Sequence, residues 1–219
     1  MRVPVTRNTL IAVLTIAVLV LIFGLIAQAV AGGETSAFDR RLILLLRDPV
    51  NPADPIGPAW LQEAARDVTS LGSIVVLVIV TLAVVSYLFL ARERISAGLL
   101  LVAVFGGIAL VDLLKALFAR PRPDLVRHAA RVFTASFPSG HASLSAIAYL
   151  TMGALLARAQ SSTAIGRYFL ALAAVLTMLI GVTRVYLGVH YPTDVLAGWC
   201  IGLAWATACW VVAEWLESR

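Results

Sequence analysis

The sequence predicts an all-α fold: a polytopic membrane bundle of six transmembrane helices with an amphipathic loop on its outer side. Hydrophobic residues occupy 61% of the 219 positions and charged residues only 13%, about half the roughly 25% found in a soluble domain. Six apolar stretches follow one another along the chain, each close to the roughly 20 residues that cross a hydrocarbon core. Because lipid offers no partner to unpaired backbone groups, each crossing is expected to be a helix.

The apolar stretches run along the chain without a long polar block between them, so residues 1–219 are predicted to form a single membrane domain. The formal net charge is +5. No basic stripe with interleaved aromatic residues accompanies it, so nucleic acid is not expected as a partner. Cys200 and Cys209 fall on opposite faces of one predicted helix, about 13.5 Å apart along its axis. They are expected to be small packing residues and not a disulfide.

The first apolar stretch, residues 10–30, follows Arg2 and Arg7 and contains an Ala27-Gln28-Ala29 sequence near its end. These features resemble a signal peptide. The apolar run is 21 residues long, however, whereas the apolar region of a signal peptide has about 7–15. We therefore predict a retained helix. In both cases the residues that follow lie on the outer side.

The first outer loop, residues 31–70, contains two amphipathic segments. The segment "AFDRRLILLLRD" is apolar on one side and basic on the other, and "GPAWLQEAARDVTSLG" is typical of a helix that starts after proline. The turn-rich "PVNPADPIGP" separates them. Both segments are predicted to lie in the membrane interface. Two roles remain open for them: a structural cap, or a guide that leads a lipid head group sideways into a site.

The other five predicted spans are residues 71–90, 97–118, 139–157, 168–189 and 195–212. The loop "ARERIS" and the hairpin "RAQSSTAIGR" are short and basic, as cytoplasmic loops usually are. The outer segments hold more basic residues in total, but they also hold most of the acids. Four of these outer cations belong to the polar clusters described next: Lys115, Arg120, Arg122 and Arg184. The N-terminus is therefore predicted to be inside.

Three polar clusters interrupt the apolar pattern: "DLLKALFARPRPD" ends the third span, "FPSGHAS" begins the fourth, and "GVTRVYLGVHYPTDVLAG" joins the fifth to the sixth. Ionisable residues in or beside membrane spans are costly and are functional candidates. Counting crossings places all three clusters on one side of the membrane. The residues that should share this face are Lys115, Arg122, Ser139, His141, Arg184, His190 and Asp194.

These residue types favour a phosphate site. Lys115, Arg122 and Arg184 supply three cations, and arginine binds phosphate oxygens in a bidentate manner. The "PSGH" segment enters a helix, where free N–H groups favour phosphate. Within it, Ser139 offers a hydroxyl and Gly140 lets the backbone approach closely.

A second set of residues supplies proton-transfer and nucleophilic groups. Pro192 favours a helix start between His190 and Asp194, so that the carboxylate accepts a bond from one imidazole nitrogen. The other nitrogen is then free as nucleophile or base, and His141 is the natural proton donor to a leaving oxygen. Each residue alone could be an anchor or a packing residue, but the set on one face favours catalysis. The remaining charges of the outer loop are expected to be surface charge or head-group contacts: Arg120, Arg127, His128 and Arg131.

The three clusters resemble the motifs of a known family. "KALFARPRP" matches K-x6-R-P, "PSGH" matches at residues 138–141, and "TRVYLGVHYPTD" matches R-x5-H-x3-D. In this order and spacing, over residues 115–194, they are similar to the type 2 phosphatidic acid phosphatase family, which shares its catalytic core with acid phosphatases and vanadium haloperoxidases. One departure is Thr183 where the family usually has serine, and the hydroxyl is kept.

The resemblance implies a helical lipid phosphatase without a metal cofactor. The counterpart of His190 forms a phosphohistidine with help from that of Asp194, and the counterpart of His141 protonates the leaving group. The residues that it implies as phosphate ligands are Lys115, Arg122, Ser139, Gly140 and Arg184. Bacterial members act on phosphatidylglycerol phosphate, phosphatidate, undecaprenyl diphosphate and related lipids. The lack of a clustered Asp/Glu set in the sequence independently argues against a magnesium site.

The expected function is hydrolysis of a phospholipid or polyprenyl phosphate in the inner (plasma) membrane, with the site facing the periplasm or exterior and both termini cytoplasmic. A lipid phosphotransferase of the same superfamily would carry the same motifs and stays open. A phosphate transporter is disfavoured, because it would need broken helices near the midplane, and these polar groups lie at membrane edges. A haloperoxidase is disfavoured because those relatives are soluble.

Overall fold

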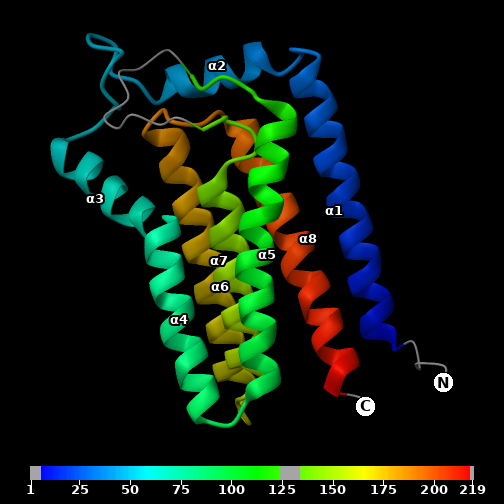
Figure 1. The fold of residues 1–219 in the computed structure, drawn as a ribbon. Helices are drawn as coiled ribbons and strands as arrows, with labels where there is room; N and C mark the ends of the chain where they lie inside the picture. The colour runs from blue at the N-terminus through cyan, green and yellow to red at the C-terminus, as the bar shows by residue number, and fades with distance from the viewer. Residues whose placement is uncertain (1–5, 124–133, 218–219) are drawn as a thin grey trace.

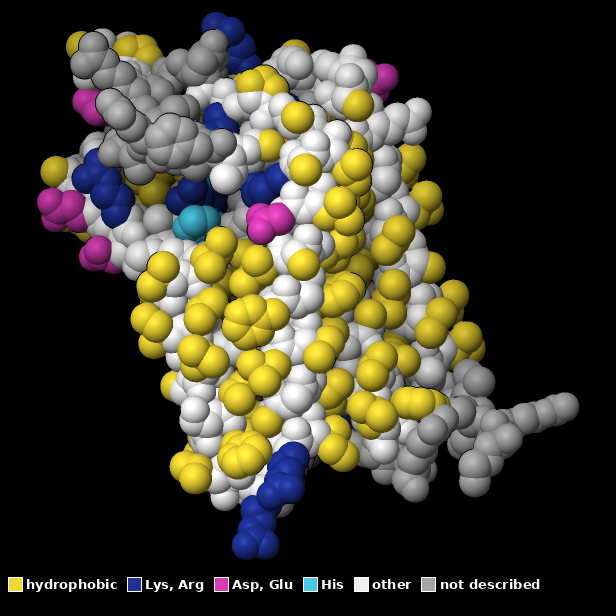
Figure 2. Space-filling model, viewed as in Figure 1, with side chains coloured by type: hydrophobic (Ala, Val, Ile, Leu, Met, Phe, Trp, Pro, Cys, Tyr) yellow, Lys and Arg dark blue, Asp and Glu magenta, His cyan; other side chains and the backbone are white. Residues whose placement is uncertain are grey.

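The structure, a computed structural model, describes residues 6–123 and 134–217. Within these ranges the regular secondary structure is eight α-helices, which confirms the predicted all-α fold. The six that correspond to predicted spans are α1 (Arg7–Ala31), α4 (Ile74–Leu90), α5 (Arg94–Phe118), α6 (Gly140–Arg158), α7 (Thr163–Tyr186) and α8 (Pro192–Glu217). On the face shown in Figure 2, their side chains form a broad apolar belt, as expected where the neighbouring medium is hydrocarbon and not water.

Five of these helices, α1, α5, α6, α7 and α8, are long and apolar enough to cross a membrane. The remaining span combines α3 (Ala59–Ser70) with α4, and the two are bent by 49° at a short break. Helix α4 runs beside α5 along the bundle, and the start of α1 and the end of α8 lie at the same end (Figure 1). That arrangement requires an even number of crossings, so α4 completes the predicted set of six.

Helix α6, which carries the "PSGH" motif at its start, packs against α5, α7 and α8 in the middle of the bundle. Small residues allow its close approach to α8. A Cβ at Gly202 of α8 would lie 2.6 Å from the carbonyl oxygen of Ser143, and one at Gly198 would lie 2.9 Å from that of Ser139. Both glycines therefore set the distance between the two helices whose first turns carry polar motifs.

The outer loop contains the two predicted amphipathic helices, α2 (Ser36–Leu45) and α3. Helix α2 lies across the end of the bundle, and α3 extends outward from it at an angle (Figure 1). The apolar side chains of Phe38, Leu42 and Leu45 line a groove of about 430 Å³ between α2, α7 and α8. One turn apart on α2, the side chains of Asp39 and Ile43 are both completely buried. Helix α2 is thus docked on the spans through both apolar and charged contacts.

Candidate active site

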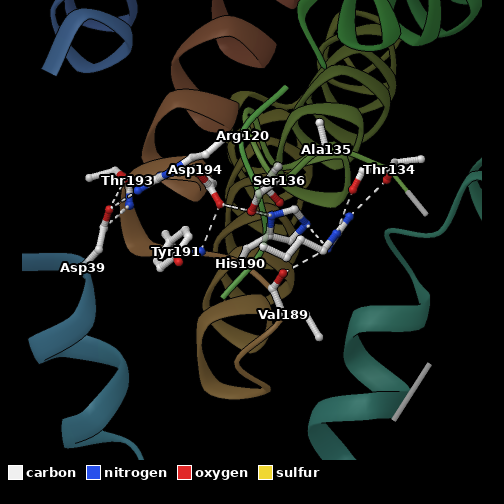
Figure 3. A network of polar contacts seen from close by, with 12 residues as sticks. Asp39, Arg120, Thr134, Ala135, Ser136, Val189, His190, Tyr191, Thr193 and Asp194 are labelled. Carbon is white, nitrogen blue, oxygen red and sulfur yellow. Dashed lines mark hydrogen bonds and ion pairs between the residues drawn. The ribbon is translucent and has the colours of Figure 1, made fainter. Parts of the chain in front are cut away.

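The three polar clusters meet at one end of the bundle, as the crossing count predicts. Basic, acidic and histidine side chains gather above the apolar belt on the face shown in Figure 2. The contacts among them connect the end of α5, the start of α6 and the α7–α8 connection (Figure 3). Residues from three separate stretches of sequence therefore form one site.

The end of α5 turns the chain into the site. Ala119 adopts a left-handed conformation with φ 44°, and the prolines at positions 121 and 123 prevent the helix from continuing. Lys115, in the last turn of α5, donates a hydrogen bond from Nζ to the carbonyl oxygen of Ala135 at 2.5 Å. The backbone N–H of Ser139 donates to the carbonyl oxygen of Asp194 at 2.9 Å. These bonds join the starts of α6 and α8 to the end of α5.

His190 and Asp194 form the predicted pair. His190 is 1% exposed and Asp194 is fully buried, and the imidazole Nδ1 lies 3.4 Å from the carboxylate Oδ2. The backbone N–H of Tyr191 donates to the same oxygen at 3.0 Å. Ser136, which is not among the residues predicted from the sequence, donates from Oγ to this oxygen and lies 3.3 Å from the His190 Nδ1. Nothing in its local sequence marks Ser136 as part of the site, because it precedes the "PSGH" motif in an irregular segment.

The second nitrogen of the imidazole faces the cationic side of the site. The His190 Nε2 lies 3.1 Å from Nη1 of Arg122. Since a guanidinium has only donors, this Nε2 is the acceptor, and the proton of a neutral ring is assigned to Nδ1 on the side of Asp194. Arg122 is itself held by the carbonyl oxygens of Val189 at 2.9 Å and Thr134 at 3.0 Å. The lone pair on Nε2 is therefore directed toward a group suited to phosphate.

Burial keeps this imidazole neutral. It lowers the pKa of His190 from its ordinary 6.5 to about 3, against the opposing effect of the Asp194 carboxylate, and the charges of Arg122 and Arg184 lower it further. The pKa of Arg120 shifts in the opposite direction. Burial lowers this pKa, but the charges of Asp194 and Asp39 raise it by more, so that it lies above its ordinary value. The unprotonated Nε2 is thus the stable form of His190 at neutral pH.

Two buried donors in the site have no partner among the residues that the structure describes: Oγ of Ser139 and Nε of Arg184. Nη1 of Arg184 bonds to Oγ1 of Thr69 at 3.1 Å. Buried polar groups are normally satisfied, so this pair of donors suits an anion. The hydroxyl of Thr183, where the family has serine, donates to the carbonyl oxygen of Ile180 in its own helix at 2.7 Å.

His141 and Gly140 lie in the first turn of α6, as expected. His141 is partly exposed and interacts electrostatically with Arg184, His190 and Arg122. A Cβ on Gly140 would stand 3.5 Å from Cε of Lys115, which is an ordinary contact. Steric crowding alone thus does not require glycine here. All eight site residues predicted from the sequence lie at the same end of the bundle.

Arg120 differs from the expectation that it is surface charge or a head-group contact. Its side chain is 12% exposed and pairs with two carboxylates, Asp39 at 2.8 Å and Asp194 at 2.6 Å. The left-handed turn at Ala119 directs it inward between α2 and α8. Four further residues of this outer loop lie outside the residues that the structure describes: Asp124, Arg127, His128 and Arg131.

Comparison with known proteins agrees with this geometry. A family model described as the PAP2 superfamily matches residues 96–218. The chain is 31% identical over 193 residues to phosphatidylglycerophosphatase B of Bacillus subtilis (strain 168), covering 84% of this chain and 88% of that protein. It is 38% identical over 114 residues to decaprenylphosphoryl-5-phosphoribose phosphatase of Mycobacterium tuberculosis (strain CDC 1551 / Oshkosh), covering 51% of this chain and 56% of that protein.

The fold also matches a solved structure. The crystal structure described as the first transmembrane PAP2 type phosphatidylglycerolphosphate phosphatase, from Bacillus subtilis, superposes with a TM-score of 0.79 at 26% sequence identity. The match covers 93% of this chain and 96% of that one. The likeness therefore includes the outer helices as well as the spans that carry the motifs.

Proposed function

The chain belongs to the PAP2 superfamily and is a membrane lipid phosphatase, and we propose that it hydrolyses phosphatidylglycerol phosphate through a phosphohistidine on His190. The observation that carries the mechanism is the pair of contacts made by this ring, Nδ1 to Asp194 at 3.4 Å and Nε2 to Arg122 at 3.1 Å. The choice of lipid rests on the similarity to phosphatidylglycerophosphatase B, which extends over most of both chains.

The first step transfers the phosphoryl group to the enzyme. The phosphate is bound by the cations and donors around the ring: Lys115, Arg122, Arg184, the Ser139 hydroxyl and the backbone N–H groups at Gly140. The lone pair of Nε2 attacks phosphorus and the bond to the lipid oxygen breaks. His141 gives its proton to that oxygen, so the lipid leaves as an alcohol. Asp194 stabilises the positive charge that develops on the ring of His190.

The second step releases phosphate. A water molecule attacks the phosphorus of phosphohistidine, and the unprotonated His141 accepts a proton from that water. The phosphorus–nitrogen bond breaks and its electron pair returns to Nε2. Phosphate is the second product, and the neutral ring of His190 is restored. Every proton in this cycle is carried by side chains of the site, and a bound metal has no step in it.

The proposed location is the plasma membrane, with the site facing the periplasm or exterior and both termini in the cytoplasm. At the opposite end of the bundle, Arg92 lies in the connection between α4 and α5, and Arg94, Arg158 and Arg167 lie in the helix turns beside the two connections. Basic residues in short connections favour the cytoplasmic side. The site end carries the buried acid–base network and the amphipathic helices, which suits the outer interface.

The test is phosphate release by purified protein from a panel of phosphatidylglycerol phosphate, phosphatidate, undecaprenyl phosphate and undecaprenyl diphosphate, with EDTA present. We expect the first lipid to give the highest kcat/KM and a His190→Ala control to give no release. Highest turnover on another lipid would refute the proposed substrate but keep the phosphatase. A labelled acceptor lipid in place of free phosphate would identify a phosphotransferase, and dependence on added magnesium would refute the mechanism.

A further inference from the structure

We propose that Arg120 and Asp39 form a positioning pair that holds the Asp194 carboxylate in register with His190, so that the interfacial helix α2 belongs to the catalytic framework. The inference rests on the proposed phosphohistidine mechanism, because it concerns the orientation of the ring that this mechanism uses. It assigns a function to two residues that the phosphate site itself does not require, and to the outer loop that carries one of them.

Arg120 bridges two elements with its two terminal nitrogens. Nη1 donates to Oδ1 of Asp194 at 2.6 Å, and Nη2 donates to Oδ2 of Asp39 at 2.8 Å. Its guanidinium also lies over the ring of Tyr191, 4.1 Å from the centroid. The planar fork of arginine allows both carboxylates to be held at once. Arg120, two residues beyond the end of α5, thereby fixes the start of α8 to α2.

Asp39 holds the other side of this bridge. Its side chain is fully buried, and its Oδ1 accepts from the backbone N–H of Thr193 at 3.1 Å. Its Oδ2 accepts from Oγ1 of Thr193 at 2.7 Å. Asp39 therefore binds a free N–H group in the first turn of α8, next to Asp194, although it comes from α2. Asp39 thus links α2 directly to Thr193, the residue that precedes Asp194.

The contacts of Asp194 are divided between its two oxygens. Oδ1 accepts from Arg120, whereas Oδ2 accepts from the Tyr191 N–H and the Ser136 hydroxyl and lies 3.4 Å from the His190 Nδ1. That second distance is long for a hydrogen bond, so the pairing with His190 depends on how the carboxylate is rotated. By binding Oδ1, Arg120 adds to the restraint that the two bonds to Oδ2 impose, and the three bonds together keep Oδ2 directed at the ring.

Arg120 is placed to act through Asp194 and not on phosphate. Figure 3 shows Arg120, Asp39 and Thr193 on one side of Asp194 and His190 on the other. Both terminal nitrogens of Arg120 are engaged by carboxylates. A residue of this kind should affect the rate of the covalent step and leave substrate binding largely unchanged, because its contact with the substrate is indirect.

The test uses Arg120→Lys in the full-length detergent-purified protein, with Arg40→Lys as control, since Arg40 is exposed on the same helix as Asp39. Lysine keeps the charge but lacks the fork. Because a misplacement of about 1 Å can cost roughly 100-fold in rate, we expect kcat to fall about 10- to 100-fold with KM within about threefold. The burst of acid-labile phosphoenzyme should slow by the same factor. Arg40→Lys should match the wild type.

A double-mutant comparison separates positioning from general stability. In an Asp194→Asn background with measurable activity, adding Arg120→Lys should lower kcat by a further factor of less than about three. The carboxylate that Arg120 positions is already altered in that background. Added guanidinium should partly restore the kcat of the Arg120→Ala variant.

The Arg120→Ala variant leaves two buried carboxylates without their cation, so its folding is checked by gel filtration. Asp39→Asn, expected to lower kcat in the same manner, provides a second variant.

The outcomes are distinguishable. A wild-type level of kcat in Arg120→Lys and Asp39→Asn overturns the positioning pair while the phosphatase stands. A loss in Arg120→Lys that is undiminished in the Asp194→Asn background also overturns it, because the effect then bypasses Asp194. Absence of phosphate release and of phosphoenzyme in the wild type overturns the proposed function and this inference together. Reduced kcat, unchanged KM and loss of the effect in the Asp194→Asn background support it.

Discussion

His190 has a different neighbour at each ring nitrogen, and this asymmetry determines what the ring can do. Nδ1 faces the buried Asp194, whereas Nε2 faces Arg122. One side favours holding a proton and the other favours a lone pair. Because burial and the surrounding cations lower the pKa of the ring, the nucleophile needs no separate base to deprotonate it at neutral pH.

The two histidines should respond differently to replacement. His190→Ala should abolish both turnover and acid-labile phosphoenzyme. His141→Ala removes a general acid, a contribution of about 10²–10⁴ in rate. It should therefore retain more activity on p-nitrophenyl phosphate, which has a good leaving group, than on a lipid phosphate. Radiolabel trapped in His190→Ala but absent in His141→Ala would mean that the two roles are reversed.

The lowered pKa of His190 also makes stability depend on pH. The folded ring takes up a proton only near its pKa of about 3, whereas in the unfolded chain it does so near 6.5. The unfolded state therefore binds more protons between these values, and stability is lost as pH falls from about 6.5, by up to about 1.4 kcal/mol per pH unit. His190→Gln should show a smaller loss of apparent Tm between pH 7 and pH 5. An equal loss in both proteins would contradict the assignment.

At the scale of elements, the close packing of α6 against α8 relates the two first turns that carry "PSGH" and Asp194. The space for a Cβ at Gly202 is occupied by backbone, since the Ser143 carbonyl oxygen would lie at 2.6 Å. Backbone atoms of a central helix cannot move aside as the end of a flexible side chain can. The glycine pattern of α8 therefore contributes to the geometry of the site as well as to stability.

Gly202→Ala should destabilise the protein by about 1–3 kcal/mol, as overpacking in a well-packed interior does, and should lower kcat. The matched control is Gly98→Ala in α5, where no atom would lie within 4 Å of the new Cβ. That change should be neutral or stabilising by up to about 1 kcal/mol, because alanine favours a helix. Thermal unfolding in detergent measures the stability change of each variant. Equal Tm values for the two variants would show that the contact is relieved by rearrangement.

For the whole molecule, the arrangement of the crossings places every motif residue at one end. The start of α1 and the end of α8 lie together at the opposite end (Figure 1), so the termini and the site are expected on different sides of the membrane. Only the orientation relative to the cell then has to be determined. The arginines in and beside the connections between α4 and α5 and between α6 and α7 favour the cytoplasm for that end.

Single cysteines should report this orientation. In a background lacking Cys200 and Cys209, a cysteine at the exposed Asn51, after α2, should react with an impermeant thiol reagent in intact cells. A cysteine at the exposed Ser162, between α6 and α7, should react only after the membrane is permeabilised. Labelling of Ser162 and protection of Asn51 in intact cells would reverse the proposed orientation.

The sequence by itself determined the spanning helices, their membrane character and the fact that the three motifs share one side of the membrane. Hydropathy reports whether about 20 consecutive residues tolerate lipid, and each crossing reverses the side, so these properties follow from local pattern and counting. The residue types of Lys115, His190 and Asp194 then indicated phosphate chemistry, and the PAP2 family match confirms the family assignment.

Only the tertiary structure decided which other polar residues join that set. Asp39 and Arg120 are 81 positions apart, and neither position carries a local signal of burial. Ser136 precedes its motif in an irregular segment, and its bond to Asp194 depends on how α6 and α8 meet. Local pattern specifies which elements form. Which charged side chains are withdrawn from water depends on the partners that the assembled helices bring to them, since an unpaired buried charge is too costly to persist.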